Sequence, residues 1–79
     1  MTKRQKLLGT LLDFPTEMRY SDVKKILEGF GYKEDGGKGS HFVFRQANHE
    51  PITLSKKHGK MVKRYQLKDI AKTLNLEEE

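Results

Sequence analysis

The sequence has no cysteine, no tryptophan and no long hydrophobic run. Without cysteine, the chain forms no disulfide, holds no metal through thiolates and has no cysteine nucleophile, which is compatible with a reducing compartment. No apolar stretch comes near the ~20 residues of a membrane-spanning helix, so we expect no membrane association. The chain starts with a basic and then an apolar segment, but the apolar part ends at Asp13 without a small-residue cleavage site, so it does not fit a signal peptide.

The length of 79 residues predicts one domain, residues 1–79. A domain of this size buries only ~60% of the surface that its unfolded chain exposes, so its core is thin. The apolar residues nevertheless fall in periodic runs, which indicates a folded chain rather than a disordered one.

Positive charge is concentrated in the second half of the chain. The formal net charge is +5, and the segment from Lys38 to Arg64 has seven lysines and arginines against one acid, Glu50. Most charged runs only keep a surface soluble. Charges of one sign gathered in one segment favour a polyanion as the partner, such as a nucleic acid.

Three amphipathic stretches predict helices. The first covers Lys3–Leu12 and forms a helical extension within residues 1–15, because Phe14-Pro15 ends it. The second begins at Ser21, the expected N-cap, and stops at Gly31, with apolar residues every three or four positions between them. The third covers Lys63–Leu74.

Three short runs between the last two helices predict strands. They are Tyr32–Asp35, Ser40–Gln46 and Pro51–Ser55, and the glycine-rich GGKG between the first two is interpreted as a turn. Consecutive strands with short connections form an antiparallel meander. The predicted fold class is therefore α+β: a three-stranded antiparallel sheet with helices packed on one face, in the order α-β-β-β-α, plus an extra N-terminal helix.

The alternation of side chains along these strands separates two faces. Phe42 and Phe44, with Ile52 and Leu54 of the next strand, belong to the face that the helices cover. The other face stays open and carries His41, Arg45 and Thr53. We therefore expect His41 to be solvent-accessible.

An exposed histidine on a basic surface suits RNA cleavage. Histidine is the side chain whose unperturbed pKa, ~6.5, lets it accept and donate protons near neutrality. The ring of His41 would take the proton of a 2′-hydroxyl, whose oxygen then attacks the adjacent phosphorus, and nearby cations would stabilise the added charge. DNA lacks that hydroxyl, so the chemistry points to RNA. The alternative is an ordinary surface histidine.

The residues expected to hold RNA phosphates surround His41 and lead into the last helix. Glycines allow a close approach of the phosphate backbone, and a helix N-terminus adds partial positive charge. His58 would be a second acid, a phosphate contact or an ordinary solvated loop histidine. Tyr65 is expected in the core rather than stacked on a base, and His49 has no expected role. The full predicted set is Lys38, Gly39, Ser40, Arg45, Lys56, Lys57, His58, Lys60, Lys63 and Arg64.

The sequence offers no pattern for a metal site or a cofactor. The three histidines are scattered, without a repeated local ligand pair. Asp13, Asp35 and Asp69 do not form the acidic cluster that magnesium needs. We therefore expect no metal and no cofactor.

Three segments carry a resemblance to a known family. ILEGFGYKEDGGKGSHFVFR, ITLSKKHGK and YQLKDIAKTL, in this order, resemble the HicA family of bacterial toxins over roughly residues 21–76. The most specific piece is Gly39-Ser40-His41, which opens the second strand after a helix that ends in GFGY. Phe42 stands where many members have a second histidine, and Ser55-Lys56-Lys57-His58 stands where many have a proline-histidine pair.

This resemblance implies a fold, an activity and a partner. Members are small proteins with a fold like the double-stranded-RNA-binding domain. They cleave messenger RNA as toxins of type II toxin–antitoxin systems, without a metal. His41 would then occupy the position of the catalytic histidine, acting as general base. A cognate antitoxin of the HicB type would cover this surface in a hetero-complex, the chain alone would be a monomer, and both would be cytoplasmic.

Two other functions fit the same sequence. One is a non-catalytic RNA-binding module of the same fold, in which His41 is only a contact. The other is an interaction domain whose basic face meets an acidic protein. Replacing His41 separates the first two functions. The nuclease should lose cleavage, whereas the non-catalytic module should show no cleavage and only a small change in RNA affinity.

Overall fold

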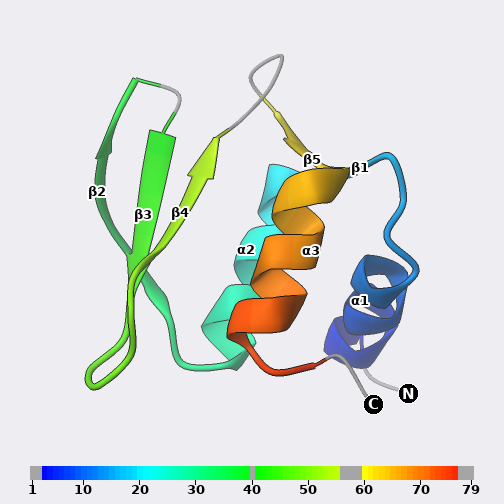
Figure 1. Ribbon diagram of the computed structural model, residues 1–79, viewed down its shortest axis with the longest axis horizontal. Coiled ribbons are helices and arrows are strands. Elements are labelled where there is room, and N and C mark those ends of the chain that lie inside the picture. The colour runs from blue at the N-terminus through cyan, green and yellow to red at the C-terminus, as the bar shows by residue number, and fades with distance from the viewer. Residues whose placement is uncertain (1–2, 40, 56–59, 77–79) are drawn as a thin grey trace.

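The helices and strands form three layers (Figure 1). The computed structural model describes residues 3–39, 41–55 and 60–76. A sheet of β2, β3 and β4 lies on one side of α2 and α3, and α1 lies on their other side. In chain order the elements are α1 (Lys3–Leu12), β1 (Glu17–Arg19), α2 (Tyr20–Gly29), β2 (Lys33–Lys38), β3 (His41–Arg45), β4 (Ile52–Ser55), β5 (Met61–Lys63) and α3 (Arg64–Thr73).

The antiparallel sheet has the predicted strand order, β2-β3-β4. Phe44 and Leu54 are almost completely buried on the face toward the helices, whereas His41, Arg45 and Thr53 are exposed on the other. The predicted α+β class, with a three-stranded sheet and helices on one face, is confirmed. Within the part of the chain that the structure describes, no helix has the length and apolar character needed to cross a membrane.

The two central helices are buried on two sides. Val23 and Ile26 of α2, with Leu67 and Ile70 of α3, are at most 1% exposed. α1 has the predicted bounds, and it packs against both helices with Leu11 completely buried. The N-terminal helix therefore covers the apolar surface of α2 and α3 that the sheet does not reach.

A second, two-stranded sheet joins the start of α2 to the start of α3. β1 pairs antiparallel with β5, and Met18 faces Val62 in register, both buried. The backbone N–H of Tyr20 extends the connection by donating to the carbonyl oxygen of Lys60 at 2.7 Å. The sequence did not reveal this sheet, because a strand of three residues is too short to show a two-residue alternation.

Two local predictions were wrong. Ser21 is not the N-cap of α2: the helix begins at Tyr20 with Arg19 as N-cap, because β1 runs directly into it. GGKG is not simply a turn, since β2 continues to Lys38 with a register shift between Glu34 and Gly37. Gly37 has φ +134, and a Cβ there would overlap the backbone oxygen of His41, so only glycine fits this bulge.

The side chain of Tyr20 connects α2 to the sheet. Its hydroxyl donates to Glu34 Oε1 of β2 at 3.0 Å, and its ring centroid lies 5.1 Å from that of Phe42 and 6.1 Å from that of Phe44. Lys24 Nζ lies 3.2 Å from the same carboxylate oxygen. Burial, and next the hydrogen bond to Glu34, raise the pKa of Tyr20 above its ordinary value near 10.

This raised pKa predicts a loss of stability at alkaline pH. Above about pH 10 the tyrosine of the unfolded chain loses its proton while the folded chain keeps it, so the free energy of unfolding falls as pH rises. Tyr20→Phe should cost about 1 kcal/mol at neutral pH because the hydrogen bond to Glu34 is removed. It should also flatten the fall in the free energy of unfolding, which begins at about pH 10 and continues above about pH 11.

Urea unfolding across that pH range measures both effects. Tyr65→Phe is the matched control, because Tyr65 is 63% exposed and its replacement should change neither the stability nor the slope. Equal pH dependence in Tyr20→Phe and the wild type would contradict the role given to Tyr20.

Candidate active site

His41 stands at the open end of the three-stranded sheet. It is the first residue of β3, it is exposed, and its strand neighbours in register are Lys38 of β2 and Ser55 of β4. The prediction that this side chain is solvent-accessible is confirmed. Because Phe44 and Leu54 occupy the opposite face, the same alternation that builds the core directs the imidazole outward.

The imidazole of His41 is held by the strand beside it. His41 Nδ1 and Ser55 Oγ lie 3.0 Å apart in a hydrogen bond between directly opposite residues of β3 and β4. Either atom can be the donor, because a neutral ring carries its proton on one nitrogen or the other. The bond uses Nδ1, so the second ring nitrogen, Nε2, is the atom to consider for substrate.

Ser55 is itself fixed from α3 by Gln66. With its amide oriented to match its neighbours, Gln66 donates from Nε2 to the carbonyl oxygen of Ser55 at 3.0 Å and accepts at Oε1 from its N–H at 2.9 Å. The Gln66 residue is only 9% exposed. β4 is an edge strand, so no further strand pairs with its outer backbone groups. The two bonds from Gln66 supply this pairing for the N–H and the carbonyl oxygen of Ser55.

Sequence reasoning missed both Ser55 and Gln66 as site residues. The signal for Gln66 was a polar residue on an apolar stripe, since it lies four residues before Ile70 and next to Leu67, both buried. No signal marked Ser55, because its partner His41 is 14 residues away and becomes its neighbour only through the strand register.

The remaining predicted residues of this sheet lie along β3. Arg45 is exposed at the end opposite His41, and its Nε lies 3.4 Å from Asp35 Oδ2. At ~3.4 Å per residue, the two side chains are about 14 Å apart along the strand and on one face. Gly39 follows β2, and Lys38 pairs with His41 through the strand backbone.

The predicted phosphate contacts near α3 do not all lie on the face of His41. Lys60 is exposed just before β5. Lys63 Nζ lies 3.5 Å from Glu17 Oε1, and Arg64 donates from Nη2 to Thr16 Oγ1 at 3.3 Å, so these two contact the chain around β1 rather than β3. In Figure 1, β1 and β5 lie at the start of α3, on the far side of β4 from β2. Four predicted contacts lie outside the described residues: Ser40, Lys56, Lys57 and His58.

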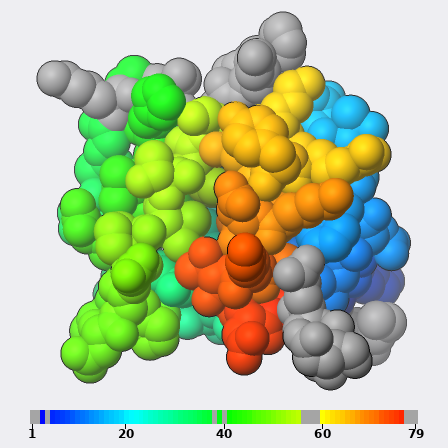
Figure 2. All heavy atoms as spheres, in the orientation of Figure 1, coloured from blue at the N-terminus to red at the C-terminus, as the bar shows by residue number. Residues whose placement is uncertain are grey.

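Tyr65 is not in the core, contrary to prediction. It is 63% exposed, because the buried side of α3 is formed by Gln66, Leu67, Ile70 and Ala71, and Tyr65 falls one position outside it. It lines a hollow of about 180 Å³ between α3 and the edge of β4, with Thr53 and Gln66. Figure 2 shows the side chains of β4 and α3 in contact along this side of the molecule.

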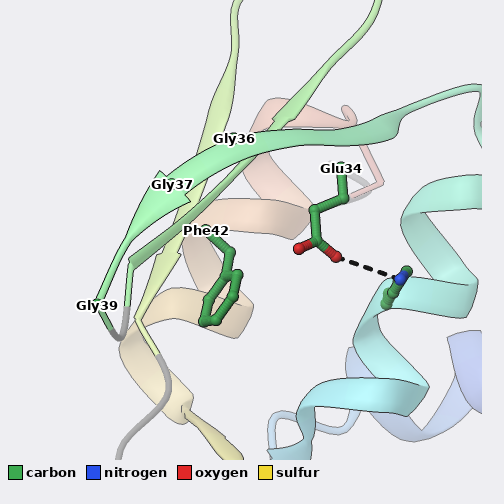
Figure 3. A pocket seen from close by; sticks show the side chains of 6 residues that line it. Glu34, Gly36, Gly37, Gly39 and Phe42 are labelled. Carbon is green, nitrogen blue, oxygen red and sulfur yellow. Dashed lines mark ion pairs between the residues drawn. The ribbon is translucent and has the colours of Figure 1, made fainter.

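A larger hollow lies on the other face of the sheet from His41. It measures about 500 Å³, and Phe42 and Glu34 point into it between the β2–β3 hairpin and α2 (Figure 3). The glycines of the hairpin form its rim. The ion pair between Lys24 and Glu34 crosses from helix to strand here, so these side chains connect α2 to β2. In the described part of the chain, no three histidine or acidic side chains are grouped so that they could hold a metal ion.

Comparison with known proteins finds a family that covers most of the chain. A family model described as the HicA toxin of bacterial toxin–antitoxin systems matches residues 20–76. The matched range begins with α2 and extends past the end of α3, so it includes His41, Ser55 and Gln66 and leaves α1 outside. No curated protein and no solved structure matches the chain.

Proposed function

Because the chain belongs to the HicA family of bacterial toxins, we propose that it is an endoribonuclease that cleaves messenger RNA with His41 as general base. The observation that supports this best is the exposed imidazole of His41, held through Nδ1 by Ser55 at the open end of the sheet. A base must reach the proton that it removes, and an exposed ring with one nitrogen fixed meets that condition.

The proposed reaction needs one proton acceptor and one proton donor. His41 takes the proton of a 2′-hydroxyl, and the oxygen forms a bond to the adjacent phosphorus while the bond from phosphorus to the 5′-oxygen breaks. A lysine or a water molecule protonates the leaving oxygen. The products are a 2′,3′-cyclic phosphate and a 5′-hydroxyl, and no metal takes part.

RNA would be held by phosphate contacts around this face. Arg45 and Lys60 are exposed, and Lys38, Gly39, Ser40, Lys56, Lys57 and His58 are proposed with them. Lys63 and Arg64 would have to exchange their contacts with Glu17 and Thr16 for phosphate. The first is a surface ion pair and the second an exposed hydrogen bond, and such surface contacts are weak. Such contacts position the RNA backbone without reading its sequence.

Membership of the family implies a cognate antitoxin as partner. We propose an antitoxin of the HicB type that covers the face with His41 and so blocks RNA. The chain without it would be a monomer. We also propose that the single domain consists of a helical extension, residues 1–15, and a toxin core, residues 21–76. We propose a cytoplasmic location, in keeping with the proposed messenger-RNA substrate.

Cleavage should depend on His41 and on no metal. In the presence of EDTA, the purified chain should cleave single-stranded RNA, and His41→Ala should lower the rate by at least about 100-fold, because a positioned base contributes that much. Expression of the wild type should arrest growth, and His41→Ala should relieve the arrest. Urea unfolding should show that the variant stays folded.

His49→Ala is the matched control. His49 lies in the turn after β3, at the other end of the sheet, where its Nδ1 is 2.9 Å from the carbonyl oxygen of Ala47. Its replacement should leave cleavage unchanged. RNA binding without cleavage by the wild type would favour the non-catalytic module, and equal cleavage by His41→Ala would exclude the proposed base.

RNA affinity should fall with added salt through the release of counterions. A plot of log K against log salt should be linear, and Arg45→Ala should reduce its slope by about 0.7, because the variant neutralises one phosphate fewer on single-stranded RNA. Lys72→Ala is the control, since Lys72 is exposed in the last turn of α3, away from His41. An unchanged slope in Arg45→Ala would remove that residue from the RNA-binding surface.

A further inference from the structure

We propose that Ser55 and Gln66 are positioning residues that hold His41 in the one tautomer able to act as a base. The inference rests on the proposed nuclease function and adds two residues to its site. Ser55 Oγ accepts a hydrogen bond from the Nδ1–H of His41, so that Nε2 carries the lone pair that takes the 2′-hydroxyl proton. Gln66 fixes the backbone of Ser55 so that this hydroxyl stays in place.

The tautomer decides whether the exposed nitrogen of His41 can accept a proton. A neutral imidazole has one N–H donor and one lone pair. If the proton sits on Nδ1, Nε2 is a base; if it sits on Nε2, only Nδ1 could accept, and that atom is already bonded to Ser55 at 3.0 Å. The direction of this single hydrogen bond therefore separates a competent ring from an incompetent one.

A serine oxygen that accepts from Nδ1 suits the whole reaction. When Nε2 takes a proton the ring becomes positive, and both of its nitrogens are then donors. The bond from Nδ1–H to Ser55 Oγ needs no rearrangement at that moment, and it strengthens because its donor has become charged. A serine that donated to Nδ1 would instead have to rotate its hydroxyl before the ring could be protonated.

The position of Ser55 is set from two sides. In register it lies opposite His41, and its hydroxyl is on the same face as the imidazole. Its N–H and carbonyl oxygen are bonded to the amide of Gln66 at 2.9 and 3.0 Å. An edge strand ends at this residue, and strand ends open easily unless their backbone groups are paired. Gln66 supplies that pairing from a rigid helix.

The tautomer of His41 can be read by nitrogen NMR of the histidine rings, without any substrate. The wild type should show His41 protonated at Nδ1 when the ring is neutral. His49 is an internal reference. The carbonyl oxygen of Ala47, 2.9 Å from its Nδ1, can only accept a hydrogen bond, so this Nδ1 must carry the proton. Ser55→Ala should remove the preference for Nδ1–H at His41 and leave His49 unchanged.

Kinetics of RNA cleavage test the consequence. Ser55→Ala should lower kcat by about 10- to 100-fold, by analogy with the partners that orient metal-ligating histidines, with little change in KM. Ser55→Thr keeps the hydroxyl and should restore most of the rate. Thr53→Ala removes the next hydroxyl on the same face of β4, opposite Val43, and should have no effect.

Gln66→Met removes the two hydrogen bonds to the backbone of Ser55 and keeps a similar side-chain volume. It should lower kcat in the same way, and the double variant with Ser55→Ala should be no slower than Ser55→Ala alone, because both act through one bond. Additive effects of the two substitutions would remove Gln66 from the proposal. Urea unfolding of each variant separates this effect from unfolding of the chain.

The outcomes distinguish this proposal from the nuclease function itself. A wild-type chain that does not cleave RNA overturns the nuclease proposal, whichever tautomer the NMR shows. Normal cleavage by the wild type, together with an unchanged kcat and an unchanged His41 tautomer in Ser55→Ala, overturns only the positioning role. A decrease of both Nδ1–H and kcat in Ser55→Ala, with recovery in Ser55→Thr, supports it.

Discussion

The two-residue alternation of β3 is the constraint on which the core and the candidate site both depend. Phe44 is completely buried beneath α2 and α3, and His41, three residues earlier, is therefore exposed on the opposite face. A slip of one residue in the register would place the imidazole in the core and the phenylalanine in water. The bulge at Gly37 and the pairing of Phe42 with Leu54 oppose such a slip, because each fixes where β3 meets a neighbouring strand.

The helices keep this sheet in place with very few residues. α2 and α3 cover one face of the sheet and are covered in turn by α1, so a chain of 79 residues gains a core with apolar contacts on both sides of its central helices. Tyr20 and Gln66 make polar connections between the layers, one from the start of α2 to β2 and one from the start of α3 to β4, and the Lys24–Glu34 ion pair adds a second between α2 and β2. Tyr20 and Gln66 both lie where the β1–β5 sheet leads into a helix.

Periodicity predicted the features that repeat and missed those that do not. The bounds of α1, the order of the sheet and the exposure of His41 follow from runs long enough to show a period. The three-residue strands β1 and β5 carry no such repeat, and the N-cap assigned to Ser21 was displaced by the strand before it. Ser55 and Gln66 were missed because their roles come from contacts across strands and layers. The apolar stripe of α3 marked Gln66 as unusual, but no local pattern identified its partner.

The central claim is that the exposed imidazole of His41 removes a proton from the 2′-hydroxyl of RNA. The most direct test is a pair of short RNAs, identical except that one lacks the 2′-hydroxyl at the nucleotide before the cleaved bond. The unmodified strand should be cleaved to a 2′,3′-cyclic phosphate, and the modified strand should not be cleaved at that bond. Cleavage of the modified strand at the same position would contradict the claim.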